Sequence, residues 1–344
     1  MARGPGRKAP TLADVAAAVD LSQAAVSLAL RGKPGVSEVT RARVLEVARS
    51  LGYRPVSGLT RHHGGPLTVT LAIRALHGDS PDANRFYGPV LSGIEERCRR
   101  LHIRLMLAIM TVDQQNHPVE LPHTIVDHLS DGLILVGAHF ESSASHLLQG
   151  DTPAVLVDAY ADQGVFDSVT TDNVAGAEMA VLYLVARGHR EIAILGTECD
   201  AFPSILERRR GYEQAIAEAG LTAHYLDVPY YEHERAAGVA VDYLRLHPEV
   251  TAVFCANDMV AVTLLQTARQ AGMAVPGRVS VVGFDDIDLA SFISPALTTM
   301  AVDKPGMGSL AVTLLVHQLE TAKKSMTTTL VRPQLMERET VRSL

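Results

Sequence analysis

The chain has 344 residues, of which 47% are hydrophobic and 20% are charged, and this balance excludes a fibrous or largely disordered protein. Its length allows two or three domains that each bury a core. No segment reaches the ~18 consecutive apolar residues of a membrane span, and no apolar segment of a secretion signal follows the basic N-terminus, so we expect a cytoplasmic protein without a membrane partner.

The net charge of −7 is unevenly distributed. Residues 1–63 carry ten lysines and arginines against four acidic residues, a charge of +6, whereas the remaining residues sum to −13. A basic segment at one end of an acidic chain suits a nucleic-acid contact confined to that end, because phosphate neutralisation dominates such binding. A solvated basic surface is the alternative that charge alone leaves open.

The first fifty residues predict three short helices. Thr11 is suited to capping the first helix, Asp20 to the turn after it, and Ser22 to capping a second helix over residues 23–30. Ser37 is suited to capping a third helix after a glycine-containing break. This arrangement is typical of a helix-turn-helix domain, whose second helix enters the major groove of DNA.

The segment TLADVAAAVDLSQAAVSLALRGKPGVSEVTRARVLEVARSLGYRP, residues 11–55, closely resembles the DNA-binding domain of the LacI/GalR family of bacterial transcription regulators. The resemblance runs without gaps, and it implies an all-α helix-turn-helix head over residues 1–55 that binds double-stranded operator DNA. The DNA-binding residues that it implies are Thr11, Ser22, Gln23, Ala24, Ala25, Ser27, Leu28, Arg31, Lys33, Tyr53 and Leu59.

The second helix has few polar groups for reading bases. Gln23 can pair with adenine through two hydrogen bonds, whereas Ala24 and Leu28 can only contact a thymine methyl group or exclude a base. The family usually has threonine at Ala25 and often a polar residue at Leu28. We therefore expect readout partly through DNA shape, or a larger contribution from basic groups outside this helix. Those groups are Arg31, Lys33 and, in the N-terminal arm, Arg3, Arg7 and Lys8.

Residues 56–66 form a linker rich in glycine, histidine and serine. In the family this stretch becomes a hinge helix that inserts a leucine into the minor groove. Here the leucine position falls on His62, and Gly58 disfavours a helix by about 1 kcal/mol. Leu59 is the only apolar candidate for such a wedge, and a flexible tether is the competing interpretation.

From Leu67 onward, apolar strand-like runs alternate with amphipathic helical stretches. This alternation predicts an α/β body of parallel sheets covered on both faces, in two doubly wound units that divide near Asp167. The body is expected over residues 67–344. Its first lobe is expected over about 67–166 and 298–326, and its second over about 167–297 and 327–344.

Polar side chains follow several of the predicted strands, where ligands of open α/β sheets bind. They are Asp158, Asn257 with Asp258, and Asp285 with Asp286, and Arg208 lies in a helix after another strand. Acids, an amide and a guanidinium with few aromatics suit a small ligand rich in hydroxyl groups.

Asp285, Asp286 and Asp288 also allow a Mg²⁺ site, but the chain has no phosphate-binding glycine loop to accompany it. The histidines show no zinc-binding spacing, and no nucleophile motif is present. We expect no enzyme activity, no cofactor and no metal. The three cysteines, Cys98, Cys199 and Cys255, each lie in an apolar run, which predicts buried free thiols.

The runs VTTDNVAGAEMAVLYLVARGHREIAILG and FCANDMVAVTLLQTARQAGMAVPGRVSVVGFDDIDLASF resemble the periplasmic-binding-protein-like effector domain of the same family. The resemblance implies two lobes, joined by three crossovers, that close on a small molecule, and it favours a sugar or glycoside over a nucleobase. Tyr231 can replace His233 at the family's stacking position. The effector-binding residues that it implies are Phe86, Tyr87, Asp158, Ser204, Arg208, His233, Asn257 and Asp285.

We therefore expect a homodimeric repressor whose operator affinity changes when the effector closes the lobes, with a coupling of about 1–3 kcal/mol. The helix GPVLSGIEERCRRL, residues 88–101, and the region TVDQQN, residues 111–116, are the candidates for the dimer contact. The alternatives are a solute-binding protein of a sugar transporter, a regulator that responds to a nucleobase or another metabolite, and a doubly wound enzyme.

Overall fold

The computed structural model describes residues 12–30, 36–51, 67–76, 85–127, 129–141, 152–162, 166–321 and 325–344. The chain divides into two compact units, whose main boundary in the sequence lies between Leu67 and Thr68. We call the first unit the head and the second the body. The expected linker, residues 56–66, lies outside the described residues.

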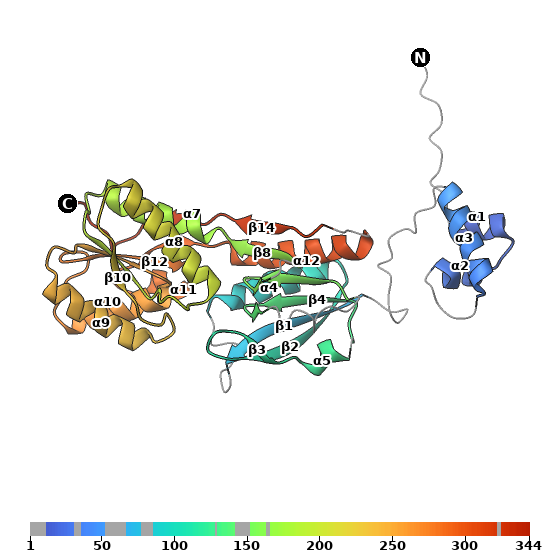
Figure 1. The fold of residues 1–344 in the computed structure, drawn as a ribbon, viewed down its shortest axis with the longest axis horizontal. Helices are drawn as coiled ribbons and strands as arrows, with labels where there is room; N and C mark the ends of the chain where they lie inside the picture. The colour runs from blue at the N-terminus through green and yellow to red at the C-terminus, as the bar shows by residue number, and fades with distance from the viewer. Residues whose placement is uncertain are drawn as a thin grey trace, which may run out of the picture. The chain divides into compact units, whose positions relative to one another are not determined.

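The described part of the head consists of three helices, as the capping residues predict (Figure 1). They are α1 (Leu12–Val19), α2 (Gln23–Leu30) and α3 (Glu38–Leu51). The Ser22 hydroxyl accepts a hydrogen bond from the backbone N–H of Ala25 at 3.1 Å, and the Ser37 hydroxyl accepts one from Thr40 at 3.2 Å. Both serines therefore cap the helices that follow them. Thr11 lies outside the described residues.

The turn between α1 and α2 fixes how these two helices pack. Asp20 has a left-handed φ of 59°, and the backbone N–H of Leu21 donates to the carbonyl of Ala16 at 3.1 Å, which is the pattern of a Schellman cap. A small apolar core joins the three helices. Its buried members are Val15, Ala16, Val19, Val26, Ala29, Val44 and Ala48.

Seven strands among the described residues form the first sheet of the body. In spatial order they are β14 (Thr328–Val331), β8 (Asp167–Thr171), β6 (Ala154–Val157), β4 (Gly132–Val136), β1 (Thr68–Leu76), β2 (Arg104–Val112) and β3 (Pro118–Glu120). All neighbours are parallel except β2 and β3. Every residue of β4 and β6 is buried, as expected for parallel strands with both faces covered.

The described residues of this first lobe form helices α4 (Tyr87–Arg100), α5 (His123–Val126) and α12 (Lys304–Glu320), and a small sheet of β5 (His139–Phe140) and β7 (Tyr160–Ala161) adjoins them. Helices α4 and α12 pack closely because each has a glycine at the contact. A Cβ added at Gly308 would lie 2.2 Å from the carbonyl oxygen of Val90, and one at Gly93 would lie 2.1 Å from that of Pro305.

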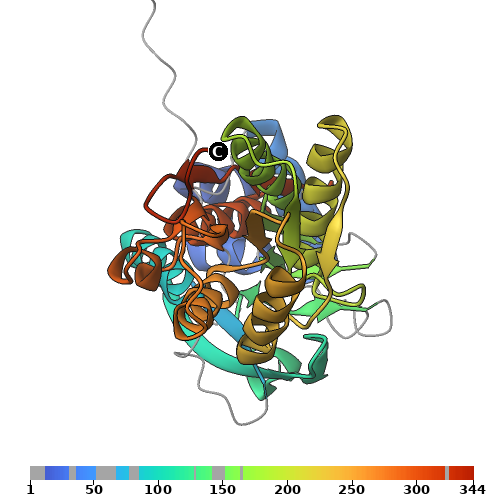
Figure 2. The same cartoon turned by 90° about the vertical axis from the view of Figure 1, so that its left-hand side faces the viewer.

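The second sheet has six strands among the described residues. Their order is β10 (His224–Leu226), β9 (Ile192–Leu195), β11 (Ala252–Cys255), β12 (Ser280–Asp285), β13 (Thr298–Ala301) and β15 (Gln334–Met336), and only β15 is antiparallel to its neighbour. Figure 2 faces this second lobe and shows its helices around the sheet. They are α7 (Asn173–Ala186), α8 (Pro203–Glu218), α9 (His233–Leu246), α10 (Asp258–Gln270) and α11 (Asp288–Phe292).

The chain crosses between the two lobes three times, after β8, after β13 and after β14. The expected lobe boundaries are wrong by a few residues at each crossing. Strands β8 and β14 belong to the first sheet rather than the second lobe, and β13 belongs to the second sheet rather than the first lobe. The cause is hydrogen-bond pairing, which assigns each strand to a sheet and which the apolar pattern of a single strand does not reveal.

Cys98 and Cys255 are buried, but Cys199 is exposed, because it lies in the loop after β9 rather than in the strand. Within the part of the chain that the structure describes, no helix has the length and apolar content to cross a membrane.

Candidate effector-binding cleft and DNA-binding helix

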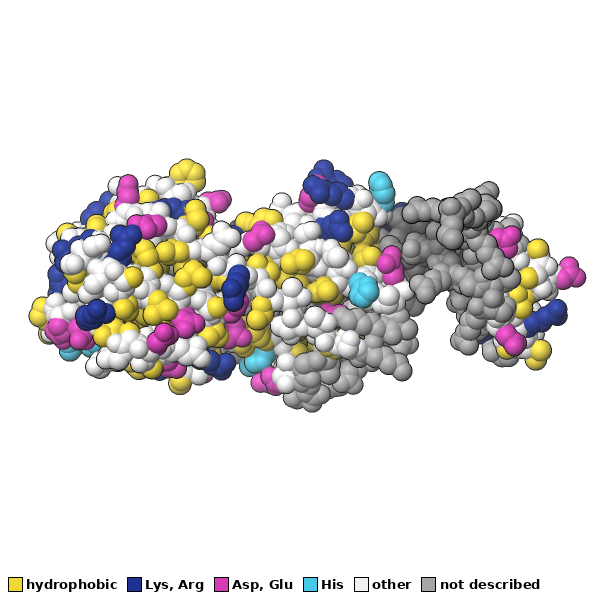
Figure 3. Space-filling model, turned by 90° about the horizontal axis from the view of Figure 1, so that it is seen from above, with side chains coloured by type: hydrophobic (Ala, Val, Ile, Leu, Met, Phe, Trp, Pro, Cys, Tyr) yellow, Lys and Arg dark blue, Asp and Glu magenta, His cyan; other side chains and the backbone are white. Residues whose placement is uncertain are grey.

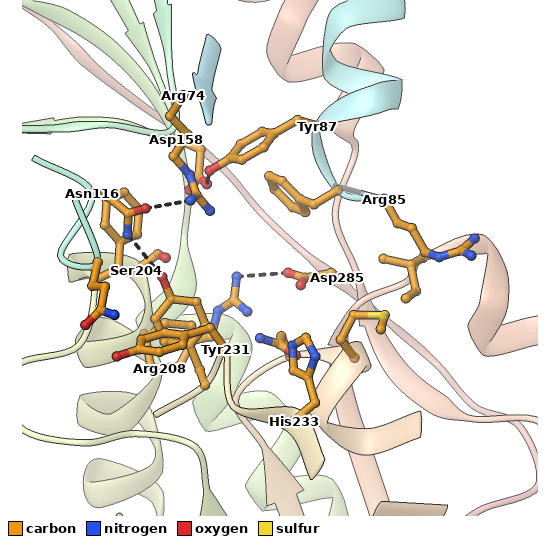
Figure 4. Close-up of a pocket in the computed structure, with 18 of the residues that line it drawn as sticks. Arg74, Arg85, Tyr87, Asn116, Asp158, Ser204, Arg208, Tyr231, His233 and Asp285 are labelled. Carbon is orange, nitrogen blue, oxygen red and sulfur yellow. Dashed lines mark hydrogen bonds and ion pairs between the residues drawn. The ribbon is translucent and has the colours of Figure 1, made fainter. Parts of the chain in front are cut away.

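A cleft of about 400 Å³ opens in the body and is lined by side chains from both lobes (Figure 4). All eight side chains expected to bind the effector line it, and Tyr231 lines it too. The first lobe contributes Phe86, Tyr87 and Asp158, and the second contributes Ser204, Arg208, His233, Asn257 and Asp285. The volume and the mixed lining suit a small polar molecule.

Arg208 is held rigidly by groups around it. Its Nη2 lies 2.9 Å from Asp285 Oδ1 in an ion pair, its Nε donates to Asn173 Oδ1 at 3.0 Å, and its Nη1 donates to the carbonyl of Ala256 at 2.6 Å. Its guanidinium also lies 3.9 Å from the ring centroid of Phe284. Arg208 is therefore oriented before any ligand arrives, which lowers the entropic cost of binding.

Asn173 is the first residue of α7 but does not cap it. The side chain of Asp172 caps that helix by accepting from the N–H of Ala175 at 3.2 Å. Asn173 instead donates to Glu207 Oε2 at 2.9 Å and accepts from Arg208. Asn173, at the start of α7, thus helps to position the guanidinium of Arg208.

Asp285 ends strand β12 with a left-handed φ of 111°. Its Oδ1 is buried and accepts no hydrogen bond with proper alignment, although Arg208 lies within ion-pair distance. Burial raises the pKa of this carboxyl, and the charges of Arg208 and Lys304 limit the rise. An oxygen with unused acceptor capacity in a cleft is suited to a ligand hydroxyl group.

Asp158 follows strand β6 with a left-handed φ of 43° and accepts a hydrogen bond from the hydroxyl of Tyr87 at 2.8 Å. Burial raises the pKa of Asp158 to about 6, although the hydrogen bond from Tyr87 and the charge of Arg208 oppose the rise. Phe86 lies edge-on to Tyr87, with ring centroids 5.2 Å apart. The first lobe therefore offers one carboxylate and an aromatic pair.

The remaining predicted side chains begin helices of the second lobe. Asn257 Oδ1 accepts from the N–H of Val260 at 2.9 Å, so this oxygen caps α10 and the amide nitrogen takes no part in the cap. Ser204 lies in the first turn of α8 and is buried. His233 begins α9, and burial lowers its pKa. The neighbouring Tyr231 is 37% exposed, so both candidates for the stacking position border the cleft.

Sequence reasoning missed several side chains of the cleft. Arg74 and Asn116 form a hydrogen bond of 2.5 Å, and Asn116 in turn donates to the hydroxyl of Tyr230 at 3.1 Å. In the sequence, Arg74 could have been recognised as a functional candidate because it is a charged residue inside an apolar run. Asn116 was assigned to the dimer contact, but it is only 2% exposed and faces the cleft, which removes this residue from that surface. The other unpredicted members are Ala75, Arg85, Gln114, Phe202, Ile205, Met259 and Ile287.

The three aspartates considered for Mg²⁺ have other roles or positions. Asp285 pairs with Arg208, Asp286 pairs with Arg338 at 2.7 Å, and Asp288 is exposed. Lys304 Nζ donates to the backbone carbonyls of Asp285 and Asp286. The described residues contain no cluster of three or more metal-ligating side chains.

The predicted recognition helix α2 begins at Gln23, whose side chain is exposed, and carries Ala25 and Leu28 half-buried. Ala24 and Ser27 lie on the same helix, and Ser22 caps it. Arg31, Lys33, Tyr53 and Leu59, like the arm residues Arg3, Arg7 and Lys8, lie outside the described residues.

Comparison with known proteins agrees with this architecture. Residues 11–56 match the lacI family of bacterial regulatory proteins, and residues 181–341 match the periplasmic binding protein-like domain. The ribose operon repressor of Escherichia coli K12 is 31% identical over 332 residues, which cover 95% of this chain and 98% of that protein. The chain belongs to the LacI family of transcriptional regulators.

Other members of the LacI family also match nearly the whole length of this chain. The HTH-type transcriptional repressor PurR of Photobacterium profundum is 28% identical over 338 residues, covering 97% of this chain and 99% of that one. A solved complex of the transcriptional regulator CelR with cellobiose shares 26% identity and a TM-score of 0.68 over 96% of this chain and 99% of that one. The dimeric Lac repressor bound to operator shares the fold, with a TM-score of 0.68 at 22% identity over 98% of this chain and 100% of that one. The family consists of DNA-binding transcriptional regulators and not of enzymes.

Proposed function

We propose that this LacI-family repressor acts as a homodimer in the bacterial cytoplasm and that a hydroxyl-rich effector, a sugar or glycoside, controls its affinity for operator DNA. The observation that carries the proposal is the cleft between the lobes, where Asp158, Asp285 and the amide of Asn257 surround a preorganised Arg208. Hydroxyl groups both donate and accept, and this mixed set of partners serves them better than an apolar pocket does.

The relatives do not decide between a sugar and a nucleobase as the effector. One is named for a ribose operon, another carries the name PurR, and CelR was solved with cellobiose. The polar groups of this cleft support the sugar, because two carboxylates that face the ligand favour several hydroxyl donors. His233 at the stacking position offers a smaller ring face than an aromatic hydrocarbon would, which disfavours a flat nucleobase.

Control of DNA binding follows from the position of the contacts. Arg208 and Asp285 belong to the second lobe, Asp158 and Tyr87 to the first, so a ligand that touches both sets favours one arrangement of the lobes. Helix α4 and the exposed apolar side chains of β2, Leu107 and Ile109 at 63% and 52% exposure, support a dimer contact on the first lobe. Closure then changes how the two heads fit two half-sites.

The test of DNA reading compares Gln23→Ala with Gln270→Ala, since both glutamines are exposed and only the first lies on α2. Sequence preference is measured by selection from a random DNA library, and affinity on the selected site by fluorescence anisotropy. Loss of the hydrogen bonds from Gln23 is expected to weaken binding by about 1–3 kcal/mol and to relax one base position. Equal preference in both variants would remove α2 from the reading role.

A further inference from the structure

Arg74 places a positive charge in the cleft without a carboxylate partner. It lies near the end of strand β1, and its guanidinium points toward Asn116 and Tyr87 (Figure 4). Nη1 donates to Asn116 Oδ1, and the guanidinium lies 5.4 Å from the ring centroid of Tyr87. Nε is buried and has no hydrogen-bond partner. Among the residues that the structure describes, no carboxylate lies within 4.0 Å of this guanidinium.

Arg208, another arginine of the cleft, differs from Arg74 because a carboxylate lies within ion-pair distance of its guanidinium. Arg208 has an ion pair with Asp285 and two further hydrogen bonds. The remaining carboxylate of the lining, Asp158, accepts a hydrogen bond from Tyr87 and acts on the charge of Arg74 only from beyond ion-pair distance. Three arginines and two aspartates line the described part of the cleft, so the lining carries an excess of positive charge. Arg74 is half-buried and has no ion pair within 4.0 Å among the described residues, and a guanidinium that is partly withdrawn from water is stabilised further by a direct anionic partner.

The backbone around Arg74 leaves space for this side chain. Gly137, after strand β4, has a φ of +79°, and a Cβ added there would lie 2.9 Å from Arg74 Cδ and 2.6 Å from the hydroxyl of Tyr87. Glycine therefore allows the arginine and the tyrosine to occupy the end of the sheet together. Arg74 therefore packs against the end of the sheet as a fixed part of the cleft wall.

We infer that the effector carries an oxyanion, a carboxylate or a phosphate, that binds against Arg74, so that the ligand is an acidic sugar derivative rather than a neutral sugar. This inference rests on the proposed function. A guanidinium matches the geometry of either oxyanion and forms charge-assisted hydrogen bonds with it. A hydroxyl group in the same place leaves Arg74 without a direct ion pair, which disfavours the neutral analogue.

The same position connects the ligand charge to the arrangement of the lobes. Arg74 donates to Asn116 of the first lobe, and Asn116 donates to Tyr230 of the second lobe at 3.1 Å. An oxyanion that binds Arg74 competes with Asn116 for the guanidinium and so acts on a hydrogen-bonded bridge between the lobes. The acidic group is thereby the part of the ligand best placed to alter lobe closure.

The experiment uses the full chain and matched ligand pairs at constant ionic strength. The pairs are glucose with glucuronate, galactose with galacturonate, glucose with glucose 6-phosphate, and ribose with ribose 5-phosphate, and binding is measured by calorimetry. At least one acidic member is expected to bind about tenfold or more tightly than its neutral partner. Whether that member is a uronate or a phosphate identifies the oxyanion.

Three variants locate the effect. Arg74→Gln is expected to remove the preference for the acidic member, and Arg74→Lys to keep part of it, because the charge remains while the planar fork is lost. Arg190→Gln, at an exposed arginine outside the cleft, is expected to bind as the natural chain does. A preference that survives Arg74→Gln would contradict the assignment.

Two further outcomes overturn the inference without touching the repressor function. One is a panel in which every neutral sugar that binds does so as tightly as its acidic partner, and the other is a panel in which no acidic member binds. In either case specific operator binding, measured on the same preparation, still supports the regulator. Loss of specific operator binding would instead contradict the proposed function itself.

Discussion

Asp258 shows how a single buried residue makes the body sensitive to pH. It begins α10, is fully buried, and accepts hydrogen bonds from Thr299 Oγ1 at 2.5 Å and from the backbone N–H of Ile287 at 2.9 Å. Burial is the main cause that raises its pKa to about 8, and the nearby charge of Asp285 is the second. The side chain therefore supports the loop after β12, which directly follows Asp285 at the end of that strand.

The raised pKa predicts a loss of stability toward alkaline pH. An unfolded aspartate titrates near pH 4, so between about pH 4 and pH 8 the folded chain keeps a proton on Asp258 that the unfolded chain has released. The free energy of unfolding is expected to fall as pH rises through that window. Asp158, with its pKa raised to about 6, adds to the fall in the lower half.

Urea denaturation at several pH values between 5 and 8 measures this slope. Asp258→Asn is expected to flatten it, because the amide does not titrate and keeps one oxygen acceptor for the N–H of Ile287, while its NH2 group can donate to Thr299. Asp288→Asn, at an exposed aspartate of α11, is expected to keep the slope of the natural chain. Equal slopes in the natural chain and in Asp258→Asn would contradict the assignment.

At the scale of elements, the contact of α4 with α12 depends on glycine. The Val90 carbonyl lies against Gly308, so a methyl group there has no space. Gly308→Ala is expected to lower the free energy of unfolding by about 1–3 kcal/mol, since the helices must move apart. Thermal or urea denaturation followed by circular dichroism measures the change.

Gly238 in α9 is the matched control, because nothing lies within 4 Å of a Cβ added there. Gly238→Ala is expected to raise the free energy of unfolding by about 0.5–1 kcal/mol through helix propensity alone. Similar effects of the two substitutions, in sign and size, would show that close packing at Gly308 does not matter.

Elements with a strong apolar signal were predictable, and the others were not. The runs that became β1, β4, β6, β9, β11 and β12 are nearly continuous in apolar residues, so parallel strands followed from composition. Strands β8 and β14 read DSVTT and TTLV, which gives no such signal and explains the misplaced lobe boundaries. The cleft residues that follow strands were predictable, whereas the roles of Asn116 and Asn173 depend on which distant segments fold beside them.

At the scale of the whole molecule, the segment expected to bind DNA and the body that contains the cleft have net charges of opposite sign. Acidic and basic side chains are interspersed over the face of the body in Figure 3, and the chain beyond residue 63 sums to −13, whereas residues 1–63 carry +6. Attraction to phosphate is therefore expected to come from the head and to be opposed by the body. This balance favours weak nonspecific binding and makes affinity sensitive to salt.

The affinity for operator DNA is expected to fall at least about a hundredfold between 50 and 200 mM KCl, because several phosphate contacts release counterions in each dimer. Fluorescence anisotropy titrations at four salt concentrations give the slope of log affinity against log salt. A slope near zero would mean that the basic residues of the head do not contact phosphates.

The three crossovers also determine the order in which the body can be completed during synthesis. Strand β14, at one edge of the first sheet, and strand β15, at one edge of the second, both come from the last residues of the chain, Thr328–Val331 and Gln334–Met336. Neither lobe can therefore finish folding before residues 328–336 leave the ribosome, and until then the edges of β8 and β13 that these strands cover are unpaired. The head, whose helices come entirely from the first residues, can fold long before the domain that regulates it exists.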